Sequence, residues 1–405
     1  MWEFFVVIIS FLSIPLLNKK NIPIGIAICI CAMLMAVLGG LRIPEIIEIL
    51  LATFADITKI QRYIVVVEIV ILGVLLKEYQ IIDEVIKYML EVIKNKKIIF
   101  MSIPALVGLL SLPGGAIISI PFIDKLGEES DLSTNQKAII NLIYRHIGMF
   151  ILPYTTGFLV VTSLVPQISL YKLVGLNSIF IVLYIAAGYF LYLRKIENNH
   201  SVSRNPVLPN LLKLLTYTAP IYLAVFCNIF FHIPFYIGMI VNLLAVYLLR
   251  PRKTFLLDVV RAFNVRILLA FIGVYLIQGV IGKMESIFSL LSIIFSNPQT
   301  IIFGIIFISF FFGLTTGFQP AALGVVLPIL LTLPISESSL LLYGHFTFVW
   351  SFVGYFFSPL HLCQLFTCEY LKISTIELYK DYWKFLLSLV VILIINYFFL
   401  SLWLK

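Results

Sequence analysis

The chain has 405 residues, of which 61% are hydrophobic and only 12% are charged, about half the share of roughly 25% found in soluble proteins. A soluble domain of this composition could not cover its surface with polar groups, whereas lipid solvates the apolar faces of a helical membrane protein. Lysine and arginine outnumber the acidic residues, 28 to 20, but they lie in short loops between apolar runs, which indicates membrane orientation rather than nucleic-acid binding.

Ten apolar stretches are candidates to cross the bilayer, so the predicted fold is an all-α integral membrane protein. They lie near residues 3–17, 22–41, 63–77, 138–165, 172–193, 212–231, 234–249, 267–282, 340–366 and 385–403. Two further apolar regions, near 98–124 and 299–333, are interrupted by Gly, Pro and Thr, and we expect each to be a re-entrant hairpin. The first stretch lacks a basic leader and a clear cleavage site; we interpret it as a retained helix, with a signal peptide as the alternative.

The basic residues predict how these spans are oriented. In the ten-span scheme most loops rich in Lys and Arg fall on one side, and the positive-inside bias makes that side cytoplasmic. Both termini are then expected outside the plasma membrane. The first hairpin would open from the cytoplasm and the second from outside.

The second half of the chain repeats the first. The matched pairs are Ile22-Pro23 with Ile233-Pro234, Gly73 with Gly279, Gly115 with Gly317 and His146 with His345, at offsets of 211, 206, 202 and 199 residues. Each half has five spans, an odd number, so the second repeat must be inverted relative to the first. We expect a first repeat over 1–195, a cytoplasmic linker over 196–211 and a second repeat over 212–405, with broken helices near 138–165 and 340–366.

Four breaks in the apolar runs predict a binding site. Two are the hairpin tips, at 111–115 and 315–320, and two interrupt the following spans, at 152–157 and 357–361. A helix broken inside the bilayer exposes backbone groups that protein, water or a ligand must satisfy. Positive half-helix ends can then hold anions, and freed carbonyls can coordinate Na⁺. One isolated break would favour a simple kink, but four breaks in two matched pairs favour a site.

Charged and polar residues near these breaks are the candidate ligands. Arg145 and His146 come about two turns into a span, so we interpret them as an anion-binding pair, with an interfacial arginine snorkelling to the cytoplasm as the alternative. His345 has no cationic neighbour and is interpreted as a structural donor that holds the hairpin, with contact to the ligand as the alternative. The predicted substrate-binding residues are Pro113, Gly114, Gly115, Arg145, His146, Thr155, Thr156, Thr315, Thr316, Gly317, Ser358 and His361.

A coupling ion, H⁺ or Na⁺, is expected, and no other cofactor. Glu68 lies in an unusually apolar run and either carries a coupling proton or pairs with a basic residue on another helix, while Gly115 and Gly317 are candidates through freed backbone groups. No metal site is predicted, because the five cysteines match no zinc or redox spacing and the histidines lack surrounding carboxylates. Metalloprotease and Gly-x-Ser-x-Gly motifs are also missing from the sequence, so we do not expect an enzyme.

One stretch carries a family resemblance. Leu-Pro-Gly-Gly-Ala-Ile-Ile-Ser-Ile-Pro over 112–121, followed by Asp131-Leu132-Ser133, Lys137-Ala138 and Tyr144-Arg145-His146, resembles the membrane family called domain of unknown function 401. The resemblance implies a scaffold of the ion-transporter superfamily, with two opposed hairpins, two broken helices and often a dimer. The dicarboxylate branch has Ser-Asn-Thr at its tips, whereas this chain has Pro-Gly-Gly and Thr-Thr-Gly, so the substrate does not carry over. Paired intramembrane aspartates are missing too, which disfavours a sodium/proton exchanger.

The sequence therefore predicts a secondary transporter of a small, anionic organic solute, coupled to H⁺ or Na⁺ by alternating access. The alternatives are a cation/proton antiporter or a passive channel of the same fold. The expected partners are the lipid bilayer, the solute or ion, and a second copy of the chain.

Overall fold

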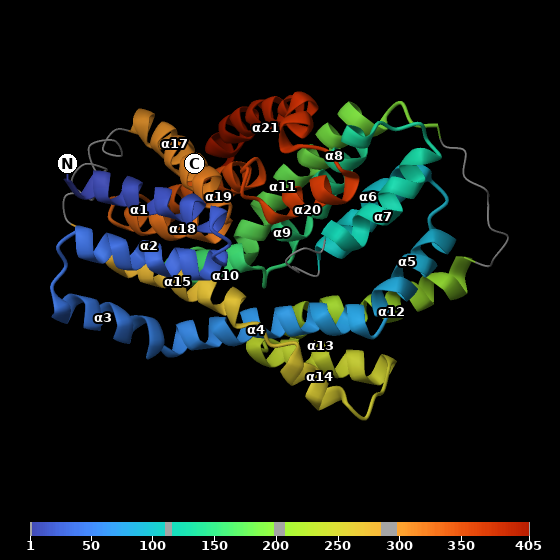
Figure 1. Ribbon diagram of the computed structural model, residues 1–405, viewed down its shortest axis with the longest axis horizontal. Coiled ribbons are helices and arrows are strands. Elements are labelled where there is room, and N and C mark those ends of the chain that lie inside the picture. Colours follow the sequence, from blue (N-terminus) through green and yellow to red (C-terminus); the bar gives the residue numbers. More distant parts are fainter. Residues whose placement is uncertain (1, 110–115, 198–206, 285–297, 405) are drawn as a thin grey trace.

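In the computed structural model, residues 2–109, 116–197, 207–284 and 298–404 are described, and all regular elements among them are helical (Figure 1). Five helical stretches of this part are long and apolar enough to cross a membrane, or six if the bent pair Phe255–Arg261 and Val265–Ile281 is one span. They are Trp2–Lys19, Thr134–Leu164, Leu170–Leu193, Val207–Phe231 and Thr375–Trp403. The all-α prediction is confirmed, while the count of ten spans stays a prediction.

The first half contains eleven labelled α-helices and one π-helical turn. They are α1 (Trp2–Lys19), α2 (Ile24–Leu38), α3 (Ile43–Phe54), α4 (Ile57–Glu78), α5 (Ile81–Val92), α6 (Lys96–Gly108), α7 (Ala116–Glu128), α8 (Thr134–Arg145), α9 (Gly148–Ile151), α10 (Thr156–Leu164), α11 (Leu170–Gly188) and the π turn Tyr189–Leu193. The side chain of Ser133 caps α8 by accepting the Gln136 backbone N–H, which fixes where the broken helix begins.

The second half contains nine described helices. They are α12 (Val207–Phe231), α13 (Phe235–Leu249), α14 (Phe255–Arg261), α15 (Val265–Ile281), α17 (Pro298–Thr316), α18 (Gln319–Leu331), α19 (Glu337–Phe356), α20 (Leu362–Leu371) and α21 (Thr375–Trp403). Pro23 precedes α2 and Pro234 precedes α13, because proline ends the preceding segment and suits a helix start.

Helices from the two halves pack against each other in the interior. α2 lies beside α15, and α13 lies beside α4 (Figure 1). Close backbone approach makes the first contact possible, since a Cβ atom at Gly25 would lie only 2.3 Å from the Arg266 carbonyl oxygen. A Cβ at Gly273 would likewise lie 2.7 Å from Ile28 Cγ2. The two halves therefore share one core rather than forming separate domains.

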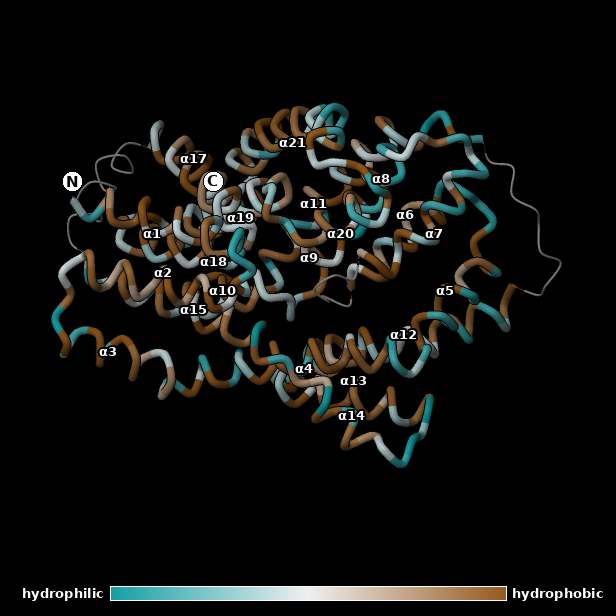
Figure 2. Tube along the Cα trace, in the orientation of Figure 1, coloured by the Kyte–Doolittle hydropathy of each residue, from teal (hydrophilic) through white to brown (hydrophobic). Residues whose placement is uncertain are grey.

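The outer helices present large apolar side chains instead of polar ones. Leu16 on α1, Phe230 on α12 and Phe398 on α21 are each more than 60% exposed. Hydrophobic colour runs along most helices, and hydrophilic stretches lie mainly at helix ends and connections (Figure 2). Exposed apolar area on this scale is compatible with an integral membrane protein, where lipid covers it.

Candidate functional site

The second hairpin turns within two residues. α17 ends at Thr316 and α18 begins at Gln319, with Gly317 in the left-handed region at a φ of 60°. The Thr316 hydroxyl donates to the Phe312 carbonyl at 2.7 Å and accepts the Phe318 N–H at 3.1 Å. In this state the hydroxyl therefore serves the turn itself, as does that of Thr315, which donates to Phe311 O at 2.9 Å.

The break between α19 and α20 is tied to this hairpin. The Ser358 hydroxyl donates to the Leu314 carbonyl of α17 at 2.6 Å and accepts the Leu360 N–H at 3.1 Å. The Tyr379 hydroxyl on α21 donates to the Phe357 carbonyl at 2.6 Å. Side chains thus satisfy backbone groups that the broken helix frees, as a break in an apolar interior requires.

The first broken helix is interrupted twice. α8 ends at Arg145, the short α9 follows, and α10 begins at Thr156 after an N-cap residue, Thr155, whose side chain makes no capping bond. Its hydroxyl makes only a long contact of 3.4 Å to the Met149 carbonyl. The N-terminus of α10 consequently has fewer side-chain partners than the break between α19 and α20.

Gln319 joins this N-terminus to the second hairpin. Its amide nitrogen donates to the Phe348 carbonyl at 2.9 Å, while within the described part of the chain its amide oxygen has no hydrogen-bond partner. A Cβ atom at Gly157 would lie 3.0 Å from that oxygen and 2.8 Å from the Phe348 ring. A buried, unpartnered amide oxygen beside a helix break is a ready contact for a ligand. Gln319 lies within the predicted tip at 315–320, but the sequence analysis did not include it among the substrate-binding residues.

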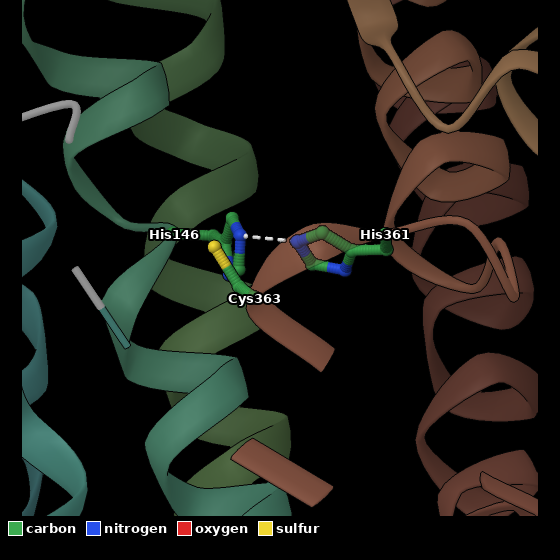
Figure 3. Close-up of side chains that lie close together, drawn as sticks. All are labelled: His146, His361 and Cys363. Atoms are coloured by element: carbon green, nitrogen blue, oxygen red, sulfur yellow. Dashed lines mark hydrogen bonds between the residues drawn. The ribbon is translucent and has the colours of Figure 1, made fainter. Parts of the chain in front are cut away.

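His146 and His361 bring the breaks of the two halves into contact. His146 lies at the C-terminal end of α8 and His361 just before α20, and their Nε2 atoms are 3.1 Å apart (Figure 3). Each ring places its Nδ1 against a backbone carbonyl, that of Leu142 at 2.7 Å and that of Phe356 at 3.1 Å. Both side chains are buried, with exposed fractions of 3% and 0%.

Cys363 completes a three-residue group. Its sulfur and the ring nitrogens of His146 and His361 all lie within 4.8 Å of one another, and the three side chains point together (Figure 3). The sequence analysis found no zinc or redox spacing among the five cysteines and did not foresee that Cys363 lies beside the two histidines. The sequence did offer one signal for this group, because His361 and Cys363 are two residues apart at a predicted helix break.

Arg145 lies inside the protein. It is 4% exposed, and its positive charge acts on the Cys363 sulfur and the Tyr355 hydroxyl. Close approach of α6 helps to enclose it, since a Cβ at Gly108 would lie 1.7 Å from the Arg145 carbonyl oxygen. This burial favours the internal interpretation of the arginine over the snorkelling alternative.

His345 is a buried structural donor, but it does not hold the hairpin as the sequence analysis expected. Its Nδ1 lies 2.8 Å from the Asn177 amide oxygen on α11, so it joins α19 to α11 and not to a hairpin. The prediction was wrong because the face of α19 that carries His345 turns toward α11. The residue is fully buried, and the bond to Asn177 satisfies its Nδ1 atom, as is usual for a histidine in a protein core.

Three further observations concern the remaining candidates. Pro113, Gly114 and Gly115 lie outside the described residues, so the first hairpin tip is not located. Glu68 on α4 is 8% exposed and takes part in no ion pair among the described residues, which disfavours the pairing alternative. Its carboxylate Oε2 also has no hydrogen-bond partner there.

Asn141 is a polar residue that the sequence analysis did not single out. Its amide oxygen accepts from Ser119 on α7 at 2.6 Å, and its amide nitrogen donates to Thr367 on α20 at 3.1 Å. These two hydrogen bonds join α7 of the first half, through α8, to α20 of the second half. A single asparagine within the apolar face of α8 was the signal that could have indicated it.

A cavity of about 460 Å³ lies elsewhere, at the ends of α11 and α12. It is lined by Tyr171, Asn228, Ile229 and His232. It contains none of the predicted site residues, and Tyr171 donates a hydrogen bond to Asn228 across it. The polar groups at the helix breaks thus lie apart from this hollow.

Comparison with known families gives one match. The family model described as Protein of unknown function (DUF401) matches residues 3–402, nearly the whole chain. The protein therefore belongs to this family, as the first-half motifs indicated. A search of curated proteins found no match.

Proposed function

We propose that this DUF401 protein is a secondary transporter of a small, anionic organic solute, coupled to H⁺ or Na⁺. The observation that carries the proposal is the buried meeting of helix breaks from the two halves. His146 of the first half contacts His361 of the second, and the hairpin tip at Gly317 lies against Leu360. Broken helices that converge in an apolar interior are the usual architecture of a transporter site.

Matched helices support the proposed inverted repeats and their ten spans. α2 and α13 each have 15 residues and follow a proline, while α7 and α18 each have 13 residues. Their contacts are also exchanged symmetrically: α7 packs on α20, and α18 packs on α10. In this proposal the α6–α7 and α17–α18 pairs are re-entrant, and the repeats cover 1–195 and 212–405.

The charges at the breaks favour an anion. α10, α18 and α20 each begin at a break, and the N-terminus of a helix carries a partial positive charge. Arg145 adds a full positive charge in the buried interior. A solute carboxylate would therefore be stabilised there, whereas a cation-exchange site would need acidic groups at the same place.

Glu68 is the proposed carrier of the coupling proton. It is buried in α4, a helix that packs against α10 and α15. A carboxyl group without an ion-pair partner in an apolar setting is costly when charged, so it readily exchanges between protonated and ionised states during a transport cycle.

The setting of the transporter is proposed from sequence. The protein is placed in the plasma membrane, and the loops rich in Lys and Arg on one side of the ten-span scheme suggest that both termini lie outside. A homodimer is proposed by analogy with the ion-transporter superfamily. These assignments are independent of the site geometry.

Flux in proteoliposomes tests the proposal. Uptake of a panel of labelled carboxylates is measured with and without imposed pH or Na⁺ gradients. Saturable uptake that follows a gradient supports a carrier. Flux that rises linearly with solute concentration and ignores ion gradients indicates a channel, and proton-driven cation exchange without carboxylate uptake indicates an antiporter.

A variant pair locates the activity. Arg145→Ala combined with Thr316→Ala should abolish most uptake, because it removes the buried cation and loosens the second tip. Thr332→Ala is the control, since its hydroxyl also donates to a carbonyl of its own helix, Ile329 O at 2.8 Å, but lies at the far end of α18. Equal uptake by the double variant and by the Thr332→Ala control would contradict the proposed site.

A further inference from the structure

The two facing imidazole nitrogens require a cation between them. A backbone carbonyl only accepts hydrogen bonds, so the Nδ1 atoms of His146 and His361 both carry hydrogens that they donate to Leu142 and Phe356. In the neutral rings both Nε2 atoms then carry lone pairs. Two lone pairs 3.1 Å apart repel unless a proton or a metal ion lies between them.

The geometry points to a buried site for a soft, monovalent metal ion, Cu(I), held by His146, His361 and Cys363. A metal at the imidazole distance of about 2.05 Å from both nitrogens would see them at an angle of about 98°, which is about 10° below the tetrahedral value. Widening the 3.1 Å separation by about 0.3 Å reaches the tetrahedral value. The Cys363 sulfur lies within 4.8 Å of both nitrogens and must approach them to about 3.6 Å to bind the same ion.

The surroundings of the two rings suit ligation. Metal-bound histidines usually donate the second ring N–H to a carbonyl or carboxylate, which fixes the tautomer, and both rings already do so. The His146 ring lies 5.1 Å from the Phe356 ring and 5.9 Å from the Tyr355 ring, and Tyr355 lies 4.4 Å from His361. This aromatic shell excludes water from the group.

The donor set and the charge select the metal. Thiolate and imidazole ligands without a carboxylate favour Cu(I) and Zn²⁺ over Mg²⁺, Ca²⁺ or Mn²⁺. Binding releases the Cys363 thiol proton, so Cu(I) with one thiolate forms a neutral unit, whereas Zn²⁺ would leave a net positive charge. The positive charge of Arg145 already acts on this sulfur, and a net positive charge on the metal unit beside it would be costly in the buried interior. The monovalent ion is therefore favoured.

Cu(I) binding by His146, His361 and Cys363 does not depend on carboxylate transport, so metal binding and transport can be tested separately. The purified full-length protein in detergent is stripped of metal and titrated anaerobically with Cu(I) in competition with bicinchoninate. One Cu(I) per chain is expected, with X-ray absorption showing two nitrogen ligands and one sulfur ligand. Carboxylate uptake is measured on metal-free protein, so failure of either result leaves the other intact.

Matched cysteine variants identify the ligand. Cys363→Ser should weaken Cu(I) binding by at least about 100-fold, because it removes the only thiolate. Cys368→Ser is the control: Cys368 is also buried on α20, but outside the group, and its binding should equal that of the wild type. His361→Gln removes an imidazole ligand and should also abolish Cu(I) binding. Size-exclusion elution and helical circular dichroism check that each variant is folded.

Three results would overturn the proposal. The first is wild-type protein that takes no Cu(I) from bicinchoninate, which would mean that the two imidazoles share a proton only. The second is equal binding by Cys363→Ser and Cys368→Ser, or an absorption spectrum without a sulfur ligand. The third is a preference for Zn²⁺ over Cu(I), which would contradict the charge argument. The absorption measurement on wild-type protein decides the matter even if a variant fails to fold.

Discussion

Gly317 lies directly against Leu360. A Cβ atom at Gly317 would be 2.7 Å from Leu360 Cβ and 3.0 Å from its carbonyl carbon, so the second hairpin tip touches the break between α19 and α20. The bond from Ser358 to the Leu314 carbonyl holds the same two segments together. Tip and break therefore form one unit, and any movement that opens the site must move them together or separate them at this contact.

The first prediction concerns Gly317→Ala. Alanine at a φ of 60° costs about 1–2 kcal/mol, and the collision with Leu360 adds about 1–3 kcal/mol, so the melting temperature should fall clearly. Gly40→Ala is the matched control, because Gly40 also has a positive φ, 74°, but no atoms within 4 Å of the added methyl. Thermal unfolding in detergent measures both. Equal losses for the two variants would show that the contact with Leu360 is unimportant.

A second prediction concerns the crossing of α6 and α8. Gly108→Ala would place a methyl carbon 1.7 Å from the Arg145 carbonyl oxygen, so the helices must separate at a cost of at least about 3 kcal/mol. Gly175→Ala, in the middle of α11 with open space around it, should be neutral or stabilise by up to about 1 kcal/mol. Folded yield and melting temperature give the comparison. A Gly108→Ala protein as stable as the Gly175→Ala protein would contradict the close crossing.

The third prediction tests the tie between hairpin and break. Ser358→Ala leaves the Leu314 carbonyl and the Leu360 N–H without their side-chain partner, which should cost about 1–3 kcal/mol. Ser388→Ala removes a hydroxyl that bonds only to Phe385 of its own helix, and it should cost less than about 0.5 kcal/mol. The melting temperatures of the two variants should therefore differ, and identical values would argue against the tie.

Glu68 gives a prediction about coupling. Glu68→Gln keeps the size of the side chain but cannot exchange a proton, so carboxylate uptake should lose its response to a pH gradient. Glu78→Gln changes an exposed glutamate at the end of the same helix and should leave that response intact. Uptake at several external pH values separates them. An unchanged pH response in Glu68→Gln would assign coupling to another group or to Na⁺.

Local sequence signals predicted the helical class and several helix breaks. Gly317 permits a left-handed turn, and Pro359 prevents a continuous helix from Phe356 to Leu362; both effects are local to the sequence. The family assignment also came from a contiguous stretch of the first half. Periodicity alone predicts one amphipathic helix over 45–59, but Asp56 caps α4 through the Thr58 N–H and divides this segment into two helices.

The candidate site was harder to predict because its contacts join distant parts of the chain. His146 and His361 are 215 residues apart, and the approach of Cys363 depends on how α20 packs against α8. Periodicity shows which face of a helix is apolar but not which helix will cover it. For the same reason the sequence analysis assigned His345 to the wrong partner and did not identify the unpartnered amide oxygen of Gln319.

The most direct test is a structure of the protein with its transported solute bound. The solute is predicted to lie where the breaks meet, in contact with the N-terminus of α10 at Thr156, with Gln319 and with the break at Ser358. Solute in the hollow lined by Tyr171, Asn228 and His232 would contradict the proposed site, as would unbroken helices through residues 152–155 and 357–361.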